Sequence, residues 1–254
     1  MKMNRREFIG LCASISVLGL TGITGRINSA IATPEELDSS YPFYCPELIE
    51  ITEKGPIIQI DGTCRCGWAR RPLLALNFED ASFSSRAKMR LAMKKWDMYH
   101  MYTPRHAIHF LIAWTPYAAF FTTFTYDRLT KKVYEETSFL PPSPEIKMMR
   151  DSTGGRTEYS SGEIIAAFDV EGQQRRLRVD FPGFAGGNLK AAIDLYFPPG
   201  YDSISSSQTT SPKRCHYGHK INCMTATGWM ELNRETFNMA PEDSFGSLDF
   251  GRGH

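Results

Sequence analysis

Histidine residues are the first side chains in this sequence that could do chemistry, because imidazole nitrogens bind metal ions and carry protons. His106 and His109 are three residues apart, and so are His216 and His219. On a β-strand that spacing points the two imidazoles to opposite faces, which argues against a shared metal ion. The sequence therefore predicts no metal site, and each histidine is expected to be a single hydrogen-bonded or surface residue.

Cysteine residues give a second candidate for chemistry. Five of them follow residue 32, so at least one thiol stays free or pairs outside the chain: Cys45, Cys64, Cys66, Cys215 and Cys223. Cys64 and Cys66 have one residue between them, whereas thioredoxin-like and zinc-binding motifs have two. Cys215 and Cys223 would share one face of a continuous strand but lie too far apart to bond. We expect buried structural thiols or one disulfide, and the spacing leaves the partners open.

Motifs for nucleophilic, acid–base or phosphate chemistry are sparse. Asp194, Glu231 and Asp249 are well separated, so only the fold could bring two carboxylates together. No serine lies in a Gly-x-Ser-x-Gly nucleophile motif. The glycine-rich segment 183–187 leads into a strand-like run, so it lacks the helix N-terminus that a phosphate loop needs. The sequence therefore predicts no cofactor.

The charge balance narrows the classes of partner. Lys and Arg number 29 against 28 Asp and Glu, a net charge of +1, which excludes a composition-level case for nucleic-acid binding. One local pair of basic residues, Arg70 and Arg71, follows Trp68. These arginines could bind an acidic group of a ligand, or lie at a strand end with their charges in solvent.

Length and composition indicate a globular protein. The 254 residues are 42% hydrophobic and 22% charged, enough for a sizeable core in one or two domains. Aromatic residues make up 12% of the chain, which favours β structure and apolar pockets. No stretch approaches the ~18 consecutive apolar residues of a membrane span.

Short apolar and β-branched runs, separated by turn residues, predict an antiparallel all-β fold, a large barrel or a sandwich. The expected hairpins join 107–113 to 118–126 and 164–170 to 175–181, and further strands are expected at 57–60, 73–76, 133–139, 191–197, 219–224 and 229–232. Segments 141–144 and 203–211 are expected to be loops because they are rich in Pro or Ser. In residues 85–96, Met89, Met93 and Trp96 have helical spacing, although 94–96 could equally begin a strand.

The first 32 residues resemble a twin-arginine export signal. Arg5 and Arg6 precede an uncharged stretch from Phe8 to Gly25, and Ala30-Ile31-Ala32 offers a small-x-small cleavage site. We therefore expect 1–32 to be a signal peptide and the protein to be exported to the periplasm or another extracytoplasmic compartment. The expected partner is the twin-arginine export machinery, and contact with a membrane is expected only through the signal, as an anchor if it is not cleaved.

Six short motifs occur in one order along the chain: GWARRPLL at 67–74, KWDMY at 95–99, TPRH at 103–106, GHKINCM at 218–224, PEDSF at 241–245 and LDFGRG at 248–253. Together they resemble the domain-of-unknown-function 2804 family over about residues 45–254. Phe250 departs from the resemblance, since the family pattern has Trp there.

The resemblance implies a lipocalin-like antiparallel β-barrel or double barrel over 33–254, similar to two-barrel proteins that include carotenoid hydratases. Relatives continue past the last motif, so we expect the barrel to be incomplete at its C-terminus. In such a barrel, inward aromatic residues such as Phe110 and Phe121 can line a cavity for an isoprenoid or acyl chain. Trp68, Arg70, Arg71 and Trp96 complete the expected ligand-binding set.

The resemblance also implies candidate catalytic residues, because adding water to an isoprenoid alkene, or cyclising it, needs an acid and aromatic rings that stabilise a cation. Asp97, His219 and Asp249 are the candidate acids within the motifs, with Trp68 and Trp96 as aromatic partners. The alternative is a role in the fold. Asp97 would then be a turn residue or an arginine partner, His219 and Lys220 would be barrel-end contacts, and Asp249 and Arg252 would form an internal ion pair.

Three functions follow from the sequence. The first is an exported protein that binds a hydrophobic or amphipathic small molecule in a barrel cavity. The second is a hydratase, cyclase or isomerase that acts on an isoprenoid or another lipid. The third is an inactive fragment.

Overall fold

The computed structural model describes residues 49–81, 85–141, 146–211 and 214–254. The signal peptide expected at 1–32 lies outside these residues, as does Cys45. Within them no helix has the length and hydropathy that a membrane span requires. The elements are β1 (Gly55–Pro56), β2 (Gly67–Ala69), β3 (Leu74–Ala75), a 3₁₀ turn (Phe78–Asp80), α2 (Arg86–Ala92), β4 (Lys94–Tyr102), β5 (His106–Thr115), β6 (Ala118–Asp127), β7 (Val133–Leu140), β8 (Gly154–Ser161), β9 (Ile164–Glu171), β10 (Gln174–Pro182), a second 3₁₀ turn (Phe184–Gly186), β11 (Asn188–Tyr196), β12 (Ile204–Ser211), β13 (Arg214–Leu232), β14 (Glu235–Met239) and β15 (Phe245–Gly253).

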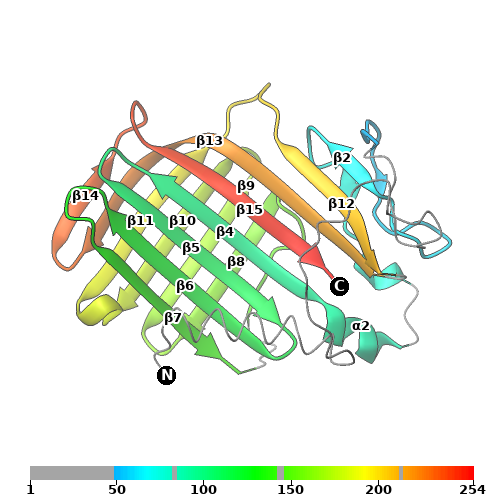
Figure 1. Ribbon diagram of the computed structural model, residues 1–254, viewed down its shortest axis with the longest axis horizontal. Helices are drawn as coiled ribbons and strands as arrows, with labels where there is room; N and C mark the ends of the chain where they lie inside the picture. Colours follow the sequence, from blue (N-terminus) through cyan, green and yellow to red (C-terminus); the bar gives the residue numbers. More distant parts are fainter. Residues whose placement is uncertain (1–48, 82–84, 142–145, 212–213) are drawn as a thin grey trace, which may run out of the picture.

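Ten strands form one antiparallel ladder in the order β7-β6-β5-β4-β15-β13-β11-β10-β9-β8. The ladder curls into a flattened, nearly closed barrel, with β4 to β7 and β15 on one side and β8 to β11 on the other (Figure 1). The ladder ends at β7 and β8, and β8 makes one further bridge, from Glu158 to Lys147. The Ser138 hydroxyl of β7 and the Tyr159 hydroxyl of β8 are 2.8 Å apart and form a hydrogen bond across this gap. The expected all-β barrel is confirmed.

The long strand β13 joins the two sides of the barrel. Its first half pairs with β15 and β12, and its second half pairs with β11 and β14. The register with β15 shifts between Ile221 and Met224, and Cys223 there has a φ of 57°. A β-bulge of this kind bends a strand and increases its twist. The runs 219–224 and 229–232, expected as two strands, are therefore one bent strand.

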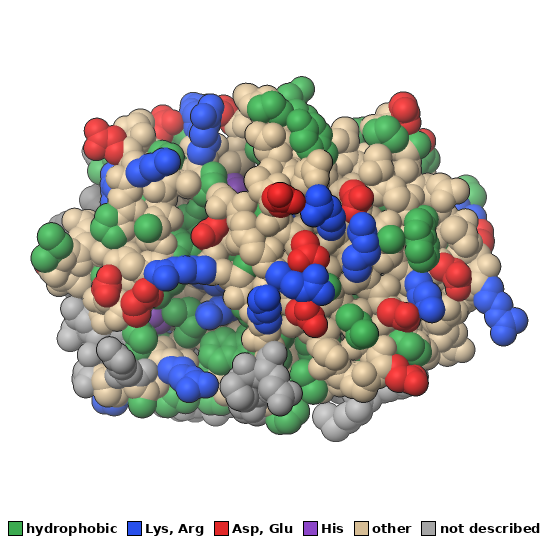
Figure 2. Space-filling view, turned by 180° about the vertical axis from the view of Figure 1, so that it is seen from behind, with side chains coloured by type: hydrophobic (Ala, Val, Ile, Leu, Met, Phe, Trp, Pro, Cys, Tyr) green, Lys and Arg blue, Asp and Glu red, His purple; other side chains and the backbone are tan. Residues whose placement is uncertain are grey.

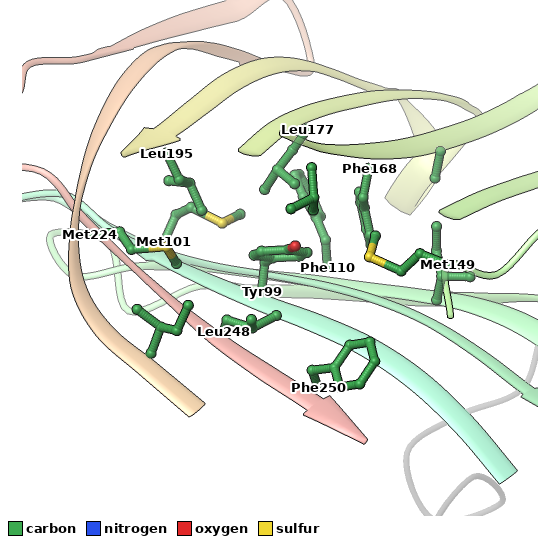
Figure 3. Packing of buried hydrophobic residues seen from close by; sticks show 14 of the residues in the cluster. Tyr99, Met101, Phe110, Met149, Phe168, Leu177, Leu195, Met224, Leu248 and Phe250 are labelled. Atoms are coloured by element: carbon green, nitrogen blue, oxygen red, sulfur yellow. The ribbon is translucent and has the colours of Figure 1, made fainter. Parts of the chain in front are cut away.

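The interior of the barrel is a packed hydrophobic core. Alternate residues of each strand point inward, as Tyr99 and Met101 do on β4 and as Ile108, Phe110 and Ile112 do on β5. Figure 3 shows side chains from both sides of the barrel meeting between the strands. The opposite face of β8 to β11 carries charged residues (Figure 2) in ion pairs such as Arg156 with Asp169 and Arg178 with Asp194. The inward face of the strands is therefore apolar, and the outward face of β8 to β11 carries paired charges.

Both predicted hairpins are confirmed as β5–β6 and β9–β10. The prediction of a loop at 203–211 was wrong, because β12 occupies 204–211 and pairs with β13 and β2. Neighbouring strands overcome the weak strand preference of serine, and the Ser205 hydroxyl donates to the Arg71 carbonyl at 2.8 Å. The apolar run 57–60 forms only an isolated bridge from Ile58 to Cys64. Residues 85–96 divide, since α2 ends at Ala92 and β4 begins at Lys94.

One disulfide joins the segment before β2 to the barrel. Cys64 pairs with Cys215 of β13, which lies 151 residues later in the chain. Cys66 and Cys223 are free thiols in the described part of the chain. This outcome agrees with the expectation of one disulfide, and it holds the segment that carries β1, β2 and β3 against the main sheet.

Candidate functional site

A cavity of about 660 Å³ lies at one end of the barrel. Its wall is one rung of the sheet, formed by Arg252 of β15, Lys95 of β4 and Trp114 of β5, which are direct cross-strand partners. Lys95 is two residues before Asp97 and therefore points to the same inward face. The remaining lining residues come from the 3₁₀ turn, α2 and the segment before β8: Leu76, Phe78, Glu79, Met89, Arg90, Met93, Ile146, Met148, Met149 and Arg150.

Helix α2 covers part of this cavity. Ser85 caps the helix, because its hydroxyl accepts a hydrogen bond from the Lys88 amide at 3.2 Å. Met89 and Met93 are four residues apart, so both side chains lie on the same side of the helix, and both line the cavity. The backbone of Met93 is extended, so the chain continues directly from the helix into β4. The short helix thus places two flexible apolar side chains opposite the sheet.

Arg252 of the cavity wall forms a buried ion pair with Asp97. The Arg252 Nη2 atom is 2.9 Å from Asp97 Oδ1, and both side chains are at most 2% exposed. Asp97 also accepts a hydrogen bond from the Thr157 hydroxyl, and Arg252 donates to the carbonyls of Trp96 and Met149. Burial raises the pKa of Asp97, and the positive charge of Arg252 offsets part of that rise. The pair therefore satisfies two charges that would be costly to bury alone.

Lys95 is the second cation of the wall. Its ammonium nitrogen lies 5.6 Å from the centroid of the Trp114 ring, a cation–π geometry. Burial lowers the pKa of Lys95, and the positive charge of Arg252 lowers it further. Within the described ranges no carboxylate comes within ion-pair distance of Lys95.

His219, a predicted catalytic residue, is buried away from the cavity wall. Its Nδ1 atom lies 2.7 Å from the Ser152 hydroxyl and its Nε2 atom 2.9 Å from the Ser203 hydroxyl. Burial, with a smaller effect from Arg175, lowers the pKa of His219 to about 3. The imidazole is therefore neutral at neutral pH and too weak a base to activate a serine there. Its geometry is that of a hydrogen-bonded bridge between two segments.

Asp249, the third predicted acid, lies on the outer face of the sheet. It accepts a hydrogen bond from Trp96 Nε1 at 3.2 Å and forms an ion pair with Lys220. The Trp96 ring also stacks on His216, with 5.3 Å between the ring centroids. The predicted ion pair between Asp249 and Arg252 does not form, because residues three apart on a strand face opposite sides. Arg252 pairs with Asp97 instead.

The remaining residues of the predicted ligand-binding set lie at two other places. Arg70 forms ion pairs with Glu50 and Asp202, both at 3.0 Å, and stacks over Trp68 at the edge of the barrel. Arg71 is exposed in the same segment. Phe110 and Phe121 are fully buried in the core, with ring centroids 6.2 Å apart. None of these six residues, Trp96 included, is among the residues that line the described cavity.

Metal binding has no support in the described part of the chain, where no three His, Cys, Asp or Glu side chains come together. His100 and His109 lie next to each other, with their Nδ1 atoms 3.3 Å apart on the outer face of β4 and β5. Burial lowers the pKa of His109 to about 3, so that imidazole is neutral at neutral pH.

Residues 48–254 match the family described as domain of unknown function 2804. The chain belongs to this family. No curated protein matches the chain.

Two solved structures resemble this member of the 2804 family at low sequence identity. Kievitone hydratase from Nectria haematococca has 9% identity and a TM-score of 0.38, covering 63% of this chain and 48% of that protein. An AttH protein from Nitrosomonas europaea has 14% identity and a TM-score of 0.44, covering 72% and 57%. The chain therefore spans about half the length of the solved structures it matches.

The cavity residues were missed at the sequence level, although one signal pointed to them. Lys95 lies within the family motif KWDMY, two residues before Asp97 and four before Tyr99. Strand alternation places all three on one face, so a lysine had to share the inward face with buried residues. Trp114 and Met89 carried no comparable signal, because their approach to Lys95 depends on how separate segments meet.

Proposed function

We propose that this member of the 2804 family binds a hydrophobic or amphipathic small molecule in the cavity at the end of the barrel. The observation that carries the proposal is the cavity itself, about 660 Å³ in volume and lined by methionine, tryptophan and basic side chains. This volume lies within the range of about 300–1,000 Å³ that is common for small-molecule sites.

The composition of the lining supports a ligand with an apolar part. Four methionines line the cavity: Met89, Met93, Met148 and Met149. Methionine side chains are flexible and polarisable, so they adapt to apolar ligands of different shapes. The core behind the wall is packed, since Tyr99, Phe110 and Phe168 are almost completely buried. The ligand is therefore expected at the barrel end, outside the core.

Binding of dodecan-1-ol, followed by isothermal titration calorimetry, tests this proposal. Met93→Trp places a large ring in the cavity and should weaken binding at least tenfold. Leu91→Trp is the matched control, because Leu91 lies in α2 two residues before Met93 but is 53% exposed and does not line the cavity. Binding that is absent from the wild-type protein, or equal in wild type and Met93→Trp, would reject the cavity as the site.

The second candidate function is hydration, cyclisation or isomerisation of a lipid alkene. One observation favours it: burial raises the pKa of Asp97, and a protonated carboxyl can donate to carbon. In a hydration, Asp97 would protonate the alkene, water would add to the cation, and the carboxylate would take back a proton from that water. Asp97 is fully buried behind Arg252, so this function requires the ion pair to open. Turnover of isoprenoid alkenes that persists unchanged in Asp97→Asn would exclude Asp97 as the acid.

We also propose export through the twin-arginine machinery, on the basis of Arg5, Arg6 and the small-x-small site at 30–32. Replacing both arginines by lysine should leave the precursor in the cytoplasm, as followed by cell fractionation. Export that is unaffected by this change would reject the twin-arginine route.

A further inference from the structure

We infer that the cavity selects amphiphiles with a single anionic headgroup, such as a carboxylate, and that Lys95 binds this headgroup. The inference rests on the proposed function, since it specifies the class of ligand for the same cavity. It is carried by the arrangement of charges along one rung of the sheet and by the half-buried ammonium of Lys95, which has no carboxylate partner among the described residues.

The rung places two cations and one indole side by side. Arg252, Lys95 and Trp114 are consecutive cross-strand partners on β15, β4 and β5, and all three line the cavity. Opposite side chains on neighbouring strands lie about 4.5–5.5 Å apart at Cβ. A ligand against this wall therefore meets an aromatic surface and positive charge together.

Two of the four basic side chains in the lining, Arg150 and Arg252, are already paired with a carboxylate, and Lys95 is not. Arg252 is paired with Asp97. Arg150 is paired with Glu79 at 2.7 Å. In the described segments, Lys95 and Arg90 have no such partner, and Arg90 is exposed on α2. Lys95 is thus a half-buried cation without a counterion. An anion bound beside it would be attracted more strongly than at an exposed site, because solvent screens the two charges less there.

Arg252 adds positive charge to the same wall without presenting its guanidinium to a ligand. Its side chain is only 2% exposed, and its guanidinium carbon lies 3.9 Å from the centroid of the Phe250 ring. Its Nε atom has no hydrogen-bond partner among the described residues and has almost no exposed surface. Lys95, which is half-buried, is therefore the cation of this rung that a headgroup can contact.

Apolar side chains line the same cavity as these cations. Met89 of α2, Met93 just after the helix and Met148 of the segment before β8 offer apolar surface for the tail. One half-buried ammonium without a counterion matches one negative charge. A doubly charged phosphate monoester would need more cations to repay its desolvation. The geometry therefore points to a monoanionic amphiphile.

The experiment compares three probes that share a twelve-carbon tail: dodecanoate, dodecan-1-ol and dodecyltrimethylammonium, each titrated below its micellar concentration. Dodecanoate should bind about tenfold more tightly than dodecan-1-ol, the gain of one charge-assisted contact, and the ammonium probe should bind most weakly. Lys95→Met should remove the preference for dodecanoate over dodecan-1-ol. Lys94→Met is the matched control, because Lys94 is exposed and faces the other side of β4.

A measurement on the wild-type protein keeps the test independent of how the variants fold. Raising the salt concentration should weaken dodecanoate binding and leave dodecan-1-ol binding unchanged. Equal affinity for dodecanoate and dodecan-1-ol, with no salt dependence, would overturn the selection of anions while the proposed cavity function stands. Failure of all three probes to bind would overturn the proposed function itself. Tight dodecanoate binding that Lys95→Met leaves unchanged would exclude Lys95 as the headgroup site.

Discussion

Replacing His219 by glutamine should make the protein less sensitive to acid. The pKa of the folded His219 is about 3, against an ordinary value of 6.5. The unfolded chain therefore binds more protons than the folded protein between these two values, and stability falls as the pH drops below about 6.5. Each pKa unit corresponds to about 1.4 kcal/mol. Protonation linked to His219 should thus lower the free energy of unfolding by about 5 kcal/mol in total below pH 3. Between pH 7 and pH 5 the decrease should be about 2 kcal/mol.

Glutamine keeps the hydrogen-bonding role of His219 but has no proton to gain. Its amide can bond to the Ser152 and Ser203 hydroxyls that the imidazole contacts. Urea unfolding at pH 7 and at pH 5, followed by circular dichroism, gives the free energy of unfolding for each variant. The loss between the two pH values should be about 2 kcal/mol smaller in His219→Gln than in the wild-type protein, because the remaining histidines still titrate.

His216→Gln is the matched control, because His216 is half-buried on the outer face and burial lowers its pKa less strongly. That variant should keep most of the wild-type dependence on pH. A pH dependence of His219→Gln within ~0.5 kcal/mol of the wild type would refute the reasoning. So would an imidazole resonance of His219 that titrates near pH 6.5 in the folded protein.

Local patterns along the chain were sufficient to predict the hairpins. They were not sufficient to predict strands formed by residues with a low preference for β structure. Residues 107–113 and 118–126 have β-branched and aromatic residues on either side of a short turn, and their pairing needs no distant partner. The serine-rich segment 204–211 has no such pattern. It is a strand because β13 and β2 lie on either side of it, and β2 is more than 130 residues away in sequence.

The candidate site shows the same division between local and distant information. Strand alternation is enough to place Asp97 and Lys95 on one face and Asp249 on the face opposite Arg252. The partner of Arg252 could not be predicted, because Asp97 lies 155 residues earlier and only the register of β15 against β4 brings the two together. The sequence suggested an ion pair between Asp249 and Arg252, which belong to the same motif. Strand geometry excludes this pair, because the two side chains face opposite sides of the sheet.

Two further changes test how the cavity wall is held in place. Asp97→Asn should lower the free energy of unfolding, measured in urea, by about 3–5 kcal/mol, because it leaves Arg252 charged and buried without its partner. The double variant Asp97→Leu with Arg252→Met should be more stable than Asp97→Asn, because it leaves no charge to desolvate. A double variant less stable than Asp97→Asn would contradict this account. Gly251 is the partner of Trp96 on the outer face of the same strands, and an added Cβ would lie 2.0 Å from the indole ring, whereas at Gly218 the nearest atom would be 3.7 Å away. Gly251→Ala should therefore displace the indole, change the tryptophan fluorescence and cost about 1–3 kcal/mol, and Gly218→Ala should do neither. Equal losses of stability in the two alanine variants would contradict this account. The close contact between Trp96 and Gly251 would then not stabilise the junction of β4 and β15, which carry Lys95 and Arg252.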